Sequence, residues 1–545
     1  MDGAGTLGIQ CAASQMGDLM ADGPLVLMAV EPLPPGDWLH SAHSVLNAAG
    51  MFTSARNTEI LVWKDRRRYR SMNYSDGWLV RRLWLSPRRG ALAVTSRRIY
   101  FIGDSAEPDR TPEHILVPAN RPPSPSAAEE LDSQWMLIRA LADGLGATTK
   151  PVDLQRIDSD LKAARSVRIG SNAYLSPPAT LNALYREHGF DETPNNFRVT
   201  VCPLESVSEM VANRFVNKLR QANSQRNVDG TVRLANVIEI TQRLTDMKRS
   251  GHAVATGRCV LFILPSQHEK PRPESLSLIA TLEAAGIPFR RAYADDPVDF
   301  SIPDQLPSLV IAAGGRPHRS PAQVPGAPVW TVGVDLSHPV DSPFSILALT
   351  LVDPDGGLAG AWTRKQARDE TVRGEALAVM LDLCRARLAS CDQSPRVMIL
   401  RDGRMFENED SGLYRRGLGA PVSLFEYRKR GNPQIVRSGG VRASPREPLA
   451  VMLPGASTMF VVTATPRTEH ALPSVAKVTW RPDWNGLDLD PPAIGRLLAA
   501  SATAPGLGLQ PRHLPAAIYW ADGIAGASDG DLRFRGVPVQ RAEIF

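Results

Sequence analysis

The sequence predicts an α/β multidomain fold, and three observations lead to this prediction. The chain has 545 residues, enough for three or four domains of ordinary size. From residue 259 onward, short apolar runs alternate with helical patterns, as in proteins whose strands are connected by helices. Two of the apolar runs end on an aspartate, Asp335 and Asp402, which predicts a polar site at a sheet edge.

The composition indicates packed domains with a mildly basic charge balance. Hydrophobic residues make up 43% of the chain, charged residues 22%, and the net charge is +5, which is compatible with a polyanionic partner. The five scattered cysteines form no C-x-x-C pair, which favours free thiols in a reducing cytoplasm over disulfides or a zinc site. We see no basic leader and no apolar run of bilayer length, so we expect a cytoplasmic protein without a membrane partner.

Residues 1–103 predict an α+β domain, because the runs 24–30 and 90–94 have the length and apolar character of strands. Ten arginines lie between residues 64 and 100, interleaved with tyrosines and tryptophans. This pattern has two interpretations, a nucleic-acid face or a solvated arginine-rich surface. Residues 104–254 begin with a proline-rich stretch typical of a linker and continue with helical patterns.

Residues 255–328 predict a small Rossmann-like domain. Its expected elements, in order, are a strand at 259–264, a helix at 274–285, and strands at 289–293 and 309–313.

Residues 329–545 predict an RNase H-like domain, because three strands are followed by a helix and a further strand. The expected strands are 329–335, 345–352, 358–364 and 396–401, then 421–427, 449–453 and 459–464; the expected helices are 370–389, 492–502 and 515–527.

Acidic residues follow two of these strands and occur in two helices. Asp335 and Asp402 are at strand ends, and Asp522 on a late helix can bring a third carboxylate to them. Hard carboxylate oxygens are suited to a pair of Mg²⁺ or Mn²⁺ ions, as in sites that cut phosphodiesters. Glu370 stands at a helix start, where an acid is also stabilising without any catalytic role.

Four motifs resemble those of the PIWI domain of Argonaute proteins, and they occur in the family's order. They are VDLSHP at 334–339, LRDG at 400–403, YRKRGNP at 427–433 and PAAIYWAD at 515–522. The last departs from the family pattern at Ala517, where proline is usual, and at Trp520, where tyrosine is usual.

The resemblance implies a catalytic tetrad of Asp335, Glu370, Asp402 and Asp522, with the three aspartates as metal ligands. Glu370 matches the family's glutamate finger because it lies 32 residues before Asp402, and Glu375 is the fallback. The resemblance also divides the chain into a MID-like domain at 255–328 and a PIWI domain at 329–545. It leaves 104–254 as a linker region in which the family's PAZ domain is reduced or absent.

The resemblance further implies contacts to nucleic acid. Arg428, Lys429 and Arg430 are expected on the phosphates of a guide–target duplex. In the MID-like domain the helix 274–283 lacks the tyrosine–lysine pair that many Argonautes use for the guide's 5′-phosphate. The remaining basic side chains either form a different 5′-end pocket or are loop charges; they are Arg290, Arg291, Arg316, His318 and Arg319.

We therefore expect a guide-directed endonuclease, acting as a monomer with a guide of RNA or DNA and a complementary target, in host defence. One alternative is a guided binding module that does not cut and recruits an effector. The other is a different RNase H-like enzyme, such as a transposase or resolvase. The sequence leaves open the guide and target type, the 5′-end chemistry of the guide, and any protein partner.

Overall fold

The structure is a computed structural model, and it describes most of the chain. The described residues are 25–27, 29–30, 38–56, 59–69, 72–86, 89–101, 108–109, 125–146, 152–158, 161–169, 173–175, 181–250, 257–266, 271–285, 287–295, 298–320, 328–339, 342–369, 371–405, 409, 411–437, 448–453, 455–464, 472–507, 511–526 and 539–541.

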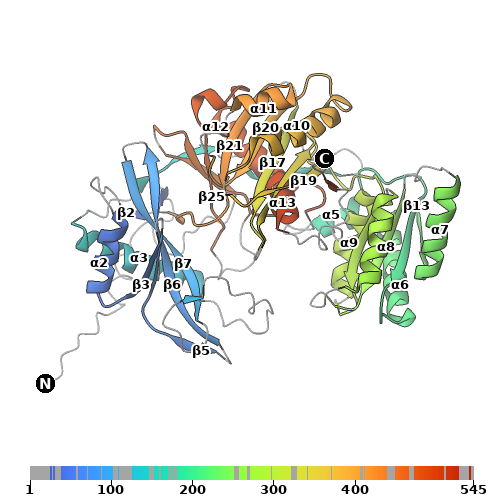
Figure 1. The fold of residues 1–545 in the computed structure, drawn as a ribbon, viewed down its shortest axis with the longest axis horizontal. Helices are drawn as coiled ribbons and strands as arrows, with labels where there is room; N and C mark the ends of the chain where they lie inside the picture. Colours follow the sequence, from blue (N-terminus) through green and yellow to red (C-terminus); the bar gives the residue numbers. More distant parts are fainter. Residues whose placement is uncertain are drawn as a thin grey trace. The chain divides into compact units, whose positions relative to one another are not determined.

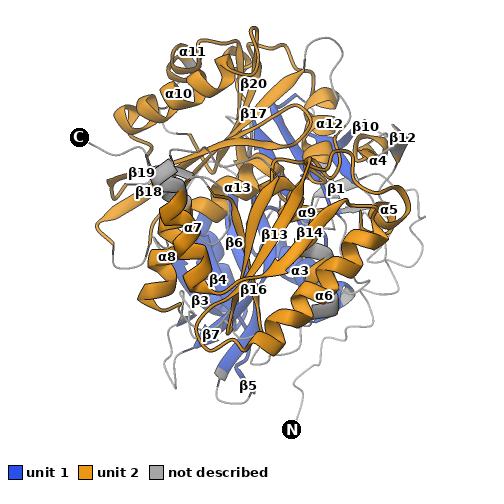
Figure 2. Ribbon diagram, turned by 90° about the vertical axis from the view of Figure 1, so that its right-hand side faces the viewer, with its two compact units in different colours: residues 1–159, 428–479 blue, residues 160–427, 480–545 orange. Residues whose placement is uncertain are grey.

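The chain forms two compact units. Unit 1 contains residues 1–159 and 428–479, and unit 2 contains residues 160–427 and 480–545 (Figure 2). Both units mix helices with sheets, so the predicted α/β multidomain fold is confirmed (Figure 1). Among the described residues, we find no helix that combines the length and the apolar character needed to cross a membrane.

Unit 1 is built around an antiparallel sheet whose path runs β2-β7-β6-β4-β3. Two helices bury their apolar faces on it, with Leu46 from one and Leu141 from the other packed against Ile60 and Val80. A second group of strands in this unit runs β10-β23-β24-β25. The bounds are β2 Ala29–Val30, β3 Phe52–Arg56, β4 Glu59–Trp63, β6 Met72–Ser86, β7 Arg89–Phe101, β10 Gln155–Asp158, β23 Leu449–Met452, β24 Thr458–Val462, β25 Ala476–Thr479, α2 Trp38–Ala48 and α3 Ala127–Gly144.

Unit 2 contains a four-stranded parallel sheet in the order β14-β13-β15-β16. Alternate residues of these strands face two apolar layers, with α6 and α9 on one side and α7 and α8 on the other. The bounds are β13 Phe197–Pro203, β14 Gly230–Leu234, β15 Arg258–Leu264, β16 Phe289–Tyr293, α6 Glu209–Gln225, α7 Val237–Ser250, α8 Pro273–Ala284 and α9 Val298–Ala312.

The structure corrects one element of this region. The run 309–313 was predicted as a strand, but it forms the end of helix α9. Leu306, Leu309, Val310 and Ala313 are all buried, at the spacing of one helix face. A five-residue apolar run does not distinguish a strand from a buried helix end. The sheet also includes β13 and β14, which precede residue 255.

The other sheet of unit 2 runs β21-β20-β17-β18-β19-β26. Helices α10 and α11 cover one face of its central strands, and α13 covers the other. The predicted strands and helices of this region are confirmed, with ends that differ by a few residues. The bounds are β17 Val329–Ser337, β18 Phe344–Val352, β19 Leu358–Ala367, β20 Arg396–Asp402, β21 Val422–Arg428, β26 Val539–Arg541, α10 Gly374–Ala389, α11 Ser411–Leu418, α12 Pro491–Ser501 and α13 Ala516–Ala525.

Candidate metal centre

Asp402 ends β20, and Asp335 lies near the end of the neighbouring strand β17 and faces the same side of the sheet. Strands β17 and β20 are parallel, with Val334 opposite Arg401. The next residue of each strand is an aspartate, and the two aspartates therefore project together on the opposite face from Val334 and Arg401. Asp335 is 6% exposed and Asp402 is 9% exposed.

Asp522 is brought to this pair by an unusually close approach of helix α13 to β17. A Cβ at Gly333 would collide with the carbonyl oxygen of Ala517 on the helix. On the adjacent strand, the hydroxyl of Thr350 donates to the same carbonyl at 2.8 Å. The glycine therefore allows helix and strand backbones to touch. Gly333 was not among the residues predicted from the sequence, although a glycine inside an apolar strand is a known signal of close backbone approach.

The three aspartates form one cluster, in which each offers a carboxylate oxygen within 4.8 Å of the others. Carboxylates this close repel one another unless a proton or a cation lies between them. A donor set made only of hard oxygens fits Mg²⁺ or Mn²⁺ and does not favour soft metals. The residues present therefore fit a divalent-metal centre.

The backbone around Asp402 is fixed by a tight turn. Gly403 has φ of +86°, and its N–H donates to the carbonyl of Tyr427 at 3.0 Å. The Tyr427 hydroxyl donates to the carbonyl of His513 at 3.3 Å. Burial, together with the negative charge of Asp402, raises the pKa of Tyr427 well above its usual value. Tyr427 therefore stays protonated beside the cluster.

Comparison with solved structures finds chains of similar fold. Drosophila Piwi superposes with a TM-score of 0.61 at 12% identity, covering 90% of this chain and 82% of that one. Clostridium butyricum Argonaute bound to a guide DNA and a 19-mer target DNA gives 0.61 at 12% identity, covering 92% and 85%. Marinitoga piezophila Argonaute in complex with 5′ OH guide RNA and target DNA gives 0.59 at 12% identity, covering 90% and 85%.

The fold is that of the Argonaute proteins. The likeness extends over about nine-tenths of the chain. No protein-family model and no curated protein matches the sequence.

In this Argonaute fold, the fourth expected acid, Glu370, lies outside the described residues. The residues on both sides of it are held by hydrogen bonds. The Asp369 N–H donates to the Ser345 hydroxyl at 3.3 Å, and the same hydroxyl lies 2.7 Å from Nδ1 of His338. The Thr371 carbonyl accepts from Gln366 at 2.7 Å. The fallback, Glu375, is exposed in the first turn of α10.

The basic stretch Arg428 to Arg430 is in unit 1, at a turn closed by Asn432. The Asn432 amide donates to the carbonyls of Arg428 at 2.7 Å and of Val475 at 2.9 Å. Arg430 is exposed, and Lys429 is partly exposed. Burial and then the nearby charge of Arg81 lower the pKa of Arg428. The Asn432 amide therefore fixes the backbone of the turn that carries Lys429 and Arg430, while the Arg428 side chain is more enclosed.

The arginines considered for a guide-end pocket have other partners. Arg316 pairs with Asp353 at 3.0 Å and with Asp355. Arg319 pairs with Asp191 at 2.5 Å and with Glu192. These contacts give both guanidinium groups a structural role within unit 2.

The other basic candidates of this region differ in burial. Arg290 is 9% exposed, and burial lowers its pKa to about 10. Arg291 is partly exposed, with its guanidinium carbon 5.5 Å from the ring centre of Tyr293. His318 is buried, with its ring nitrogens 2.6 Å from the Tyr185 hydroxyl and 2.6 Å from the Thr503 carbonyl. Of these three, Arg291 is the most accessible to a ligand.

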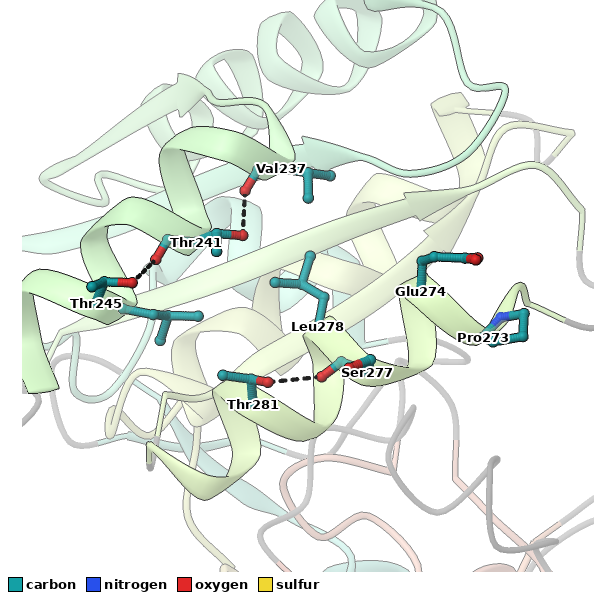
Figure 3. Close-up of a pocket in the computed structure, with 9 residues that line it drawn as sticks. Val237, Thr241, Thr245, Pro273, Glu274, Ser277, Leu278 and Thr281 are labelled. Carbon is teal, nitrogen blue, oxygen red and sulfur yellow. Dashed lines mark hydrogen bonds between the residues drawn. The ribbon is translucent and has the colours of Figure 1, made fainter.

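A groove between α7 and α8 offers a different kind of surface (Figure 3). Its volume is about 540 Å³. Three threonine hydroxyls along it donate to carbonyls one turn earlier in their own helices, from Thr241, Thr245 and Thr281. Among the residues that line it, Glu274 is the charged one. A phosphate would gain no cation from these side chains.

Proposed function

We propose that this chain is a guide-directed endonuclease of the Argonaute type, which cuts complementary DNA or RNA in defence against invading nucleic acid. The observation that carries the proposal is the meeting of Asp335, Asp402 and Asp522 within 4.8 Å. It occurs in a fold shared with structures that hold a guide and a target strand.

Each acid has a defined part in the proposed reaction. Asp335, Asp402 and Asp522 would hold two divalent ions, Mg²⁺ or Mn²⁺, and such ions would supply activated water and stabilisation of the leaving oxygen. Glu370 completes this set on the strength of the motif resemblance and its spacing from Asp402. Gly403 and the buried Tyr427 keep the Asp402 carboxylate at the sheet edge.

The nucleic acid is gripped through its backbone, and base pairing to the guide selects the target. Lys429 and Arg430 suit phosphate contact because they are accessible on a turn fixed by Asn432. Arg428 supports them from a more enclosed position. Arg291 is the remaining candidate for the guide's 5′ end, because Arg290 is enclosed and the guanidinium groups of Arg316 and Arg319 already pair with carboxylates.

The decisive experiment loads the full chain with short guides of RNA and DNA, each with a 5′-phosphate or a 5′-hydroxyl. Complementary targets are added with Mn²⁺, and products are separated by length. We expect cutting at one position opposite the guide, lost in Asp402→Ala, while guide and target binding persist. In Lys429→Gln/Arg430→Gln, target binding should weaken and its logarithmic salt slope should flatten by roughly 1 to 2.

The same assay separates the alternatives. Guided target binding without cutting under any guide would contradict the nuclease and support a guided binding module. Cutting that needs no guide would instead support another RNase H-like enzyme. Sequencing the nucleic acid that co-purifies with the protein identifies whether the natural guide is RNA or DNA.

A further inference from the structure

Behind the carboxylate cluster lies a buried ion pair between Arg401 of the LRDG motif and Glu409, which belongs to none of the four motifs. Arg401 precedes Asp402 on β20, so its side chain faces the opposite side of the sheet. It is 3% exposed, and its Nε donates to Glu409 at 3.0 Å. A second guanidinium nitrogen donates to the main-chain carbonyl of Asp402. Arg401 thereby holds the backbone of the residue that carries the second carboxylate.

Glu409 extends this contact to a different segment. It is 2% exposed, and its other oxygen accepts from the Val372 N–H at 3.2 Å. Gln366 holds the same segment, since its amide oxygen accepts from the Arg373 N–H at 3.1 Å. Glu409 therefore connects the end of β20 to residues 371–373, which precede α10.

A gain in folding stability does not by itself explain a buried ion pair at this position. Removing two charges from water costs several kcal/mol, and apolar side chains of similar volume often give equal or greater stability. Instead, the hydrogen bonds of the pair fix two backbone segments at defined positions relative to each other. Apolar packing fixes such positions less strictly.

We propose that Arg401 and Glu409 are a positioning pair for the carboxylate cluster. By fixing the Asp402 backbone relative to residues 371–373, they raise the affinity of the three aspartates for a divalent cation. The proposal rests on the proposed function only in taking the cluster as a metal site. It assigns no chemical step to either residue.

The test measures Mn²⁺ binding to the full chain in the absence of nucleic acid. The electron paramagnetic resonance signal of free Mn²⁺ reports how much of the ion remains unbound. Asp402→Asn should abolish the binding and so identify the cluster as the site. Arg401→Met/Glu409→Leu removes both charges and leaves no unpaired one buried. We expect it to bind Mn²⁺ about tenfold more weakly, as is typical when groups that hold metal ligands are removed.

A matched control is Arg316→Met/Asp353→Leu, which removes another ion pair of unit 2 that is 26% and 16% exposed. It should leave Mn²⁺ affinity unchanged. A folded Arg401→Met/Glu409→Leu protein that binds Mn²⁺ like the wild type would overturn the proposal. If that variant does not fold, Glu409→Asp keeps the charge but withdraws the carboxylate, and unchanged affinity there would overturn it equally.

The outcomes separate this inference from the proposed function. Wild-type protein that binds Mn²⁺ but never cuts a target would contradict the nuclease and leave the positioning pair to be decided by its variants. Wild-type protein without Mn²⁺ binding would overturn the positioning pair directly.

Discussion

The two sheets of unit 2 present similar edges but different chemistry. In both, parallel strands end side by side, at β17 and β20 in one sheet and at β13 to β16 in the other. The first edge gathers three carboxylates, whereas the groove between α7 and α8, the helices on one face of the second sheet, is lined by apolar and hydroxyl side chains with Glu274 as its charge. Topology therefore provides the place for a site, and the residues at matching register decide what it binds.

The largest expected contrast comes from removing one acid at each place. Asp522→Ala should reduce guided cutting to less than about 1% of the wild-type rate, because losing a ligand exceeds the roughly 10–100-fold cost of losing its supports. Glu274→Ala, the matched variant in the groove, should leave the rate unchanged. Single-turnover cutting rates compare the two variants. Equal rates for Asp522→Ala and Glu274→Ala would contradict the difference in chemistry between the two places.

A second contrast is between the buried His318 and the more exposed His188. The His318 ring lies between the Tyr185 hydroxyl and the Thr503 carbonyl. Burial lowers its pKa to about 4, although the Thr503 carbonyl and the charge of Asp191 oppose this shift. The folded state keeps the ring neutral, while the unfolded state takes up a proton below about pH 6.5. Stability should therefore be unaffected by this group above pH 6.5 and fall as pH drops towards 4, by on the order of 3 kcal/mol.

Denaturant unfolding of wild type and His318→Gln across this pH range measures the effect, because glutamine does not titrate. The difference in unfolding free energy between wild type and His318→Gln should change by on the order of 3 kcal/mol between pH 6.5 and 4. His188→Gln is the control, since His188 is 27% exposed. Parallel pH profiles for wild type and His318→Gln would show that the buried ring does not contribute.

The smallest expected effect is that of a single methyl group at Gly333. Gly333→Ala should destabilise unit 2 by roughly 1–3 kcal/mol, because the Cβ overlaps the Ala517 carbonyl and helix α13 must shift. Gly374→Ala is the matched control, since a Cβ there meets nothing within 4 Å. Denaturant midpoints compare the two variants, and an equal effect of both would contradict the close approach.

The sequence predicted the strands and helices around the cluster because their apolar runs are long and clearly bounded. It predicted that Asp335 and Asp402 stand at strand ends, but not that these strands pair, nor the register that sets the two residues side by side. The sequence also did not indicate ion pairs between residues that lie far apart in the chain. Arg319 was considered as a nucleic-acid contact, but its carboxylate partner Asp191 comes 128 residues earlier. Glu409 carried no motif, and only its burial reveals it.

The contact at Gly333 has a consequence for how the cluster tolerates change. At Gly333 and Ala517, helix α13 touches β17 through main-chain atoms, so at this contact no side chain of variable size separates the strand of Asp335 from the helix of Asp522. Exchanges among the apolar residues around them can alter packing without resetting this separation. Sequence changes among these core residues should therefore have little effect on the spacing of the carboxylates. The constraint lies at position 333, where only the hydrogen of glycine fits.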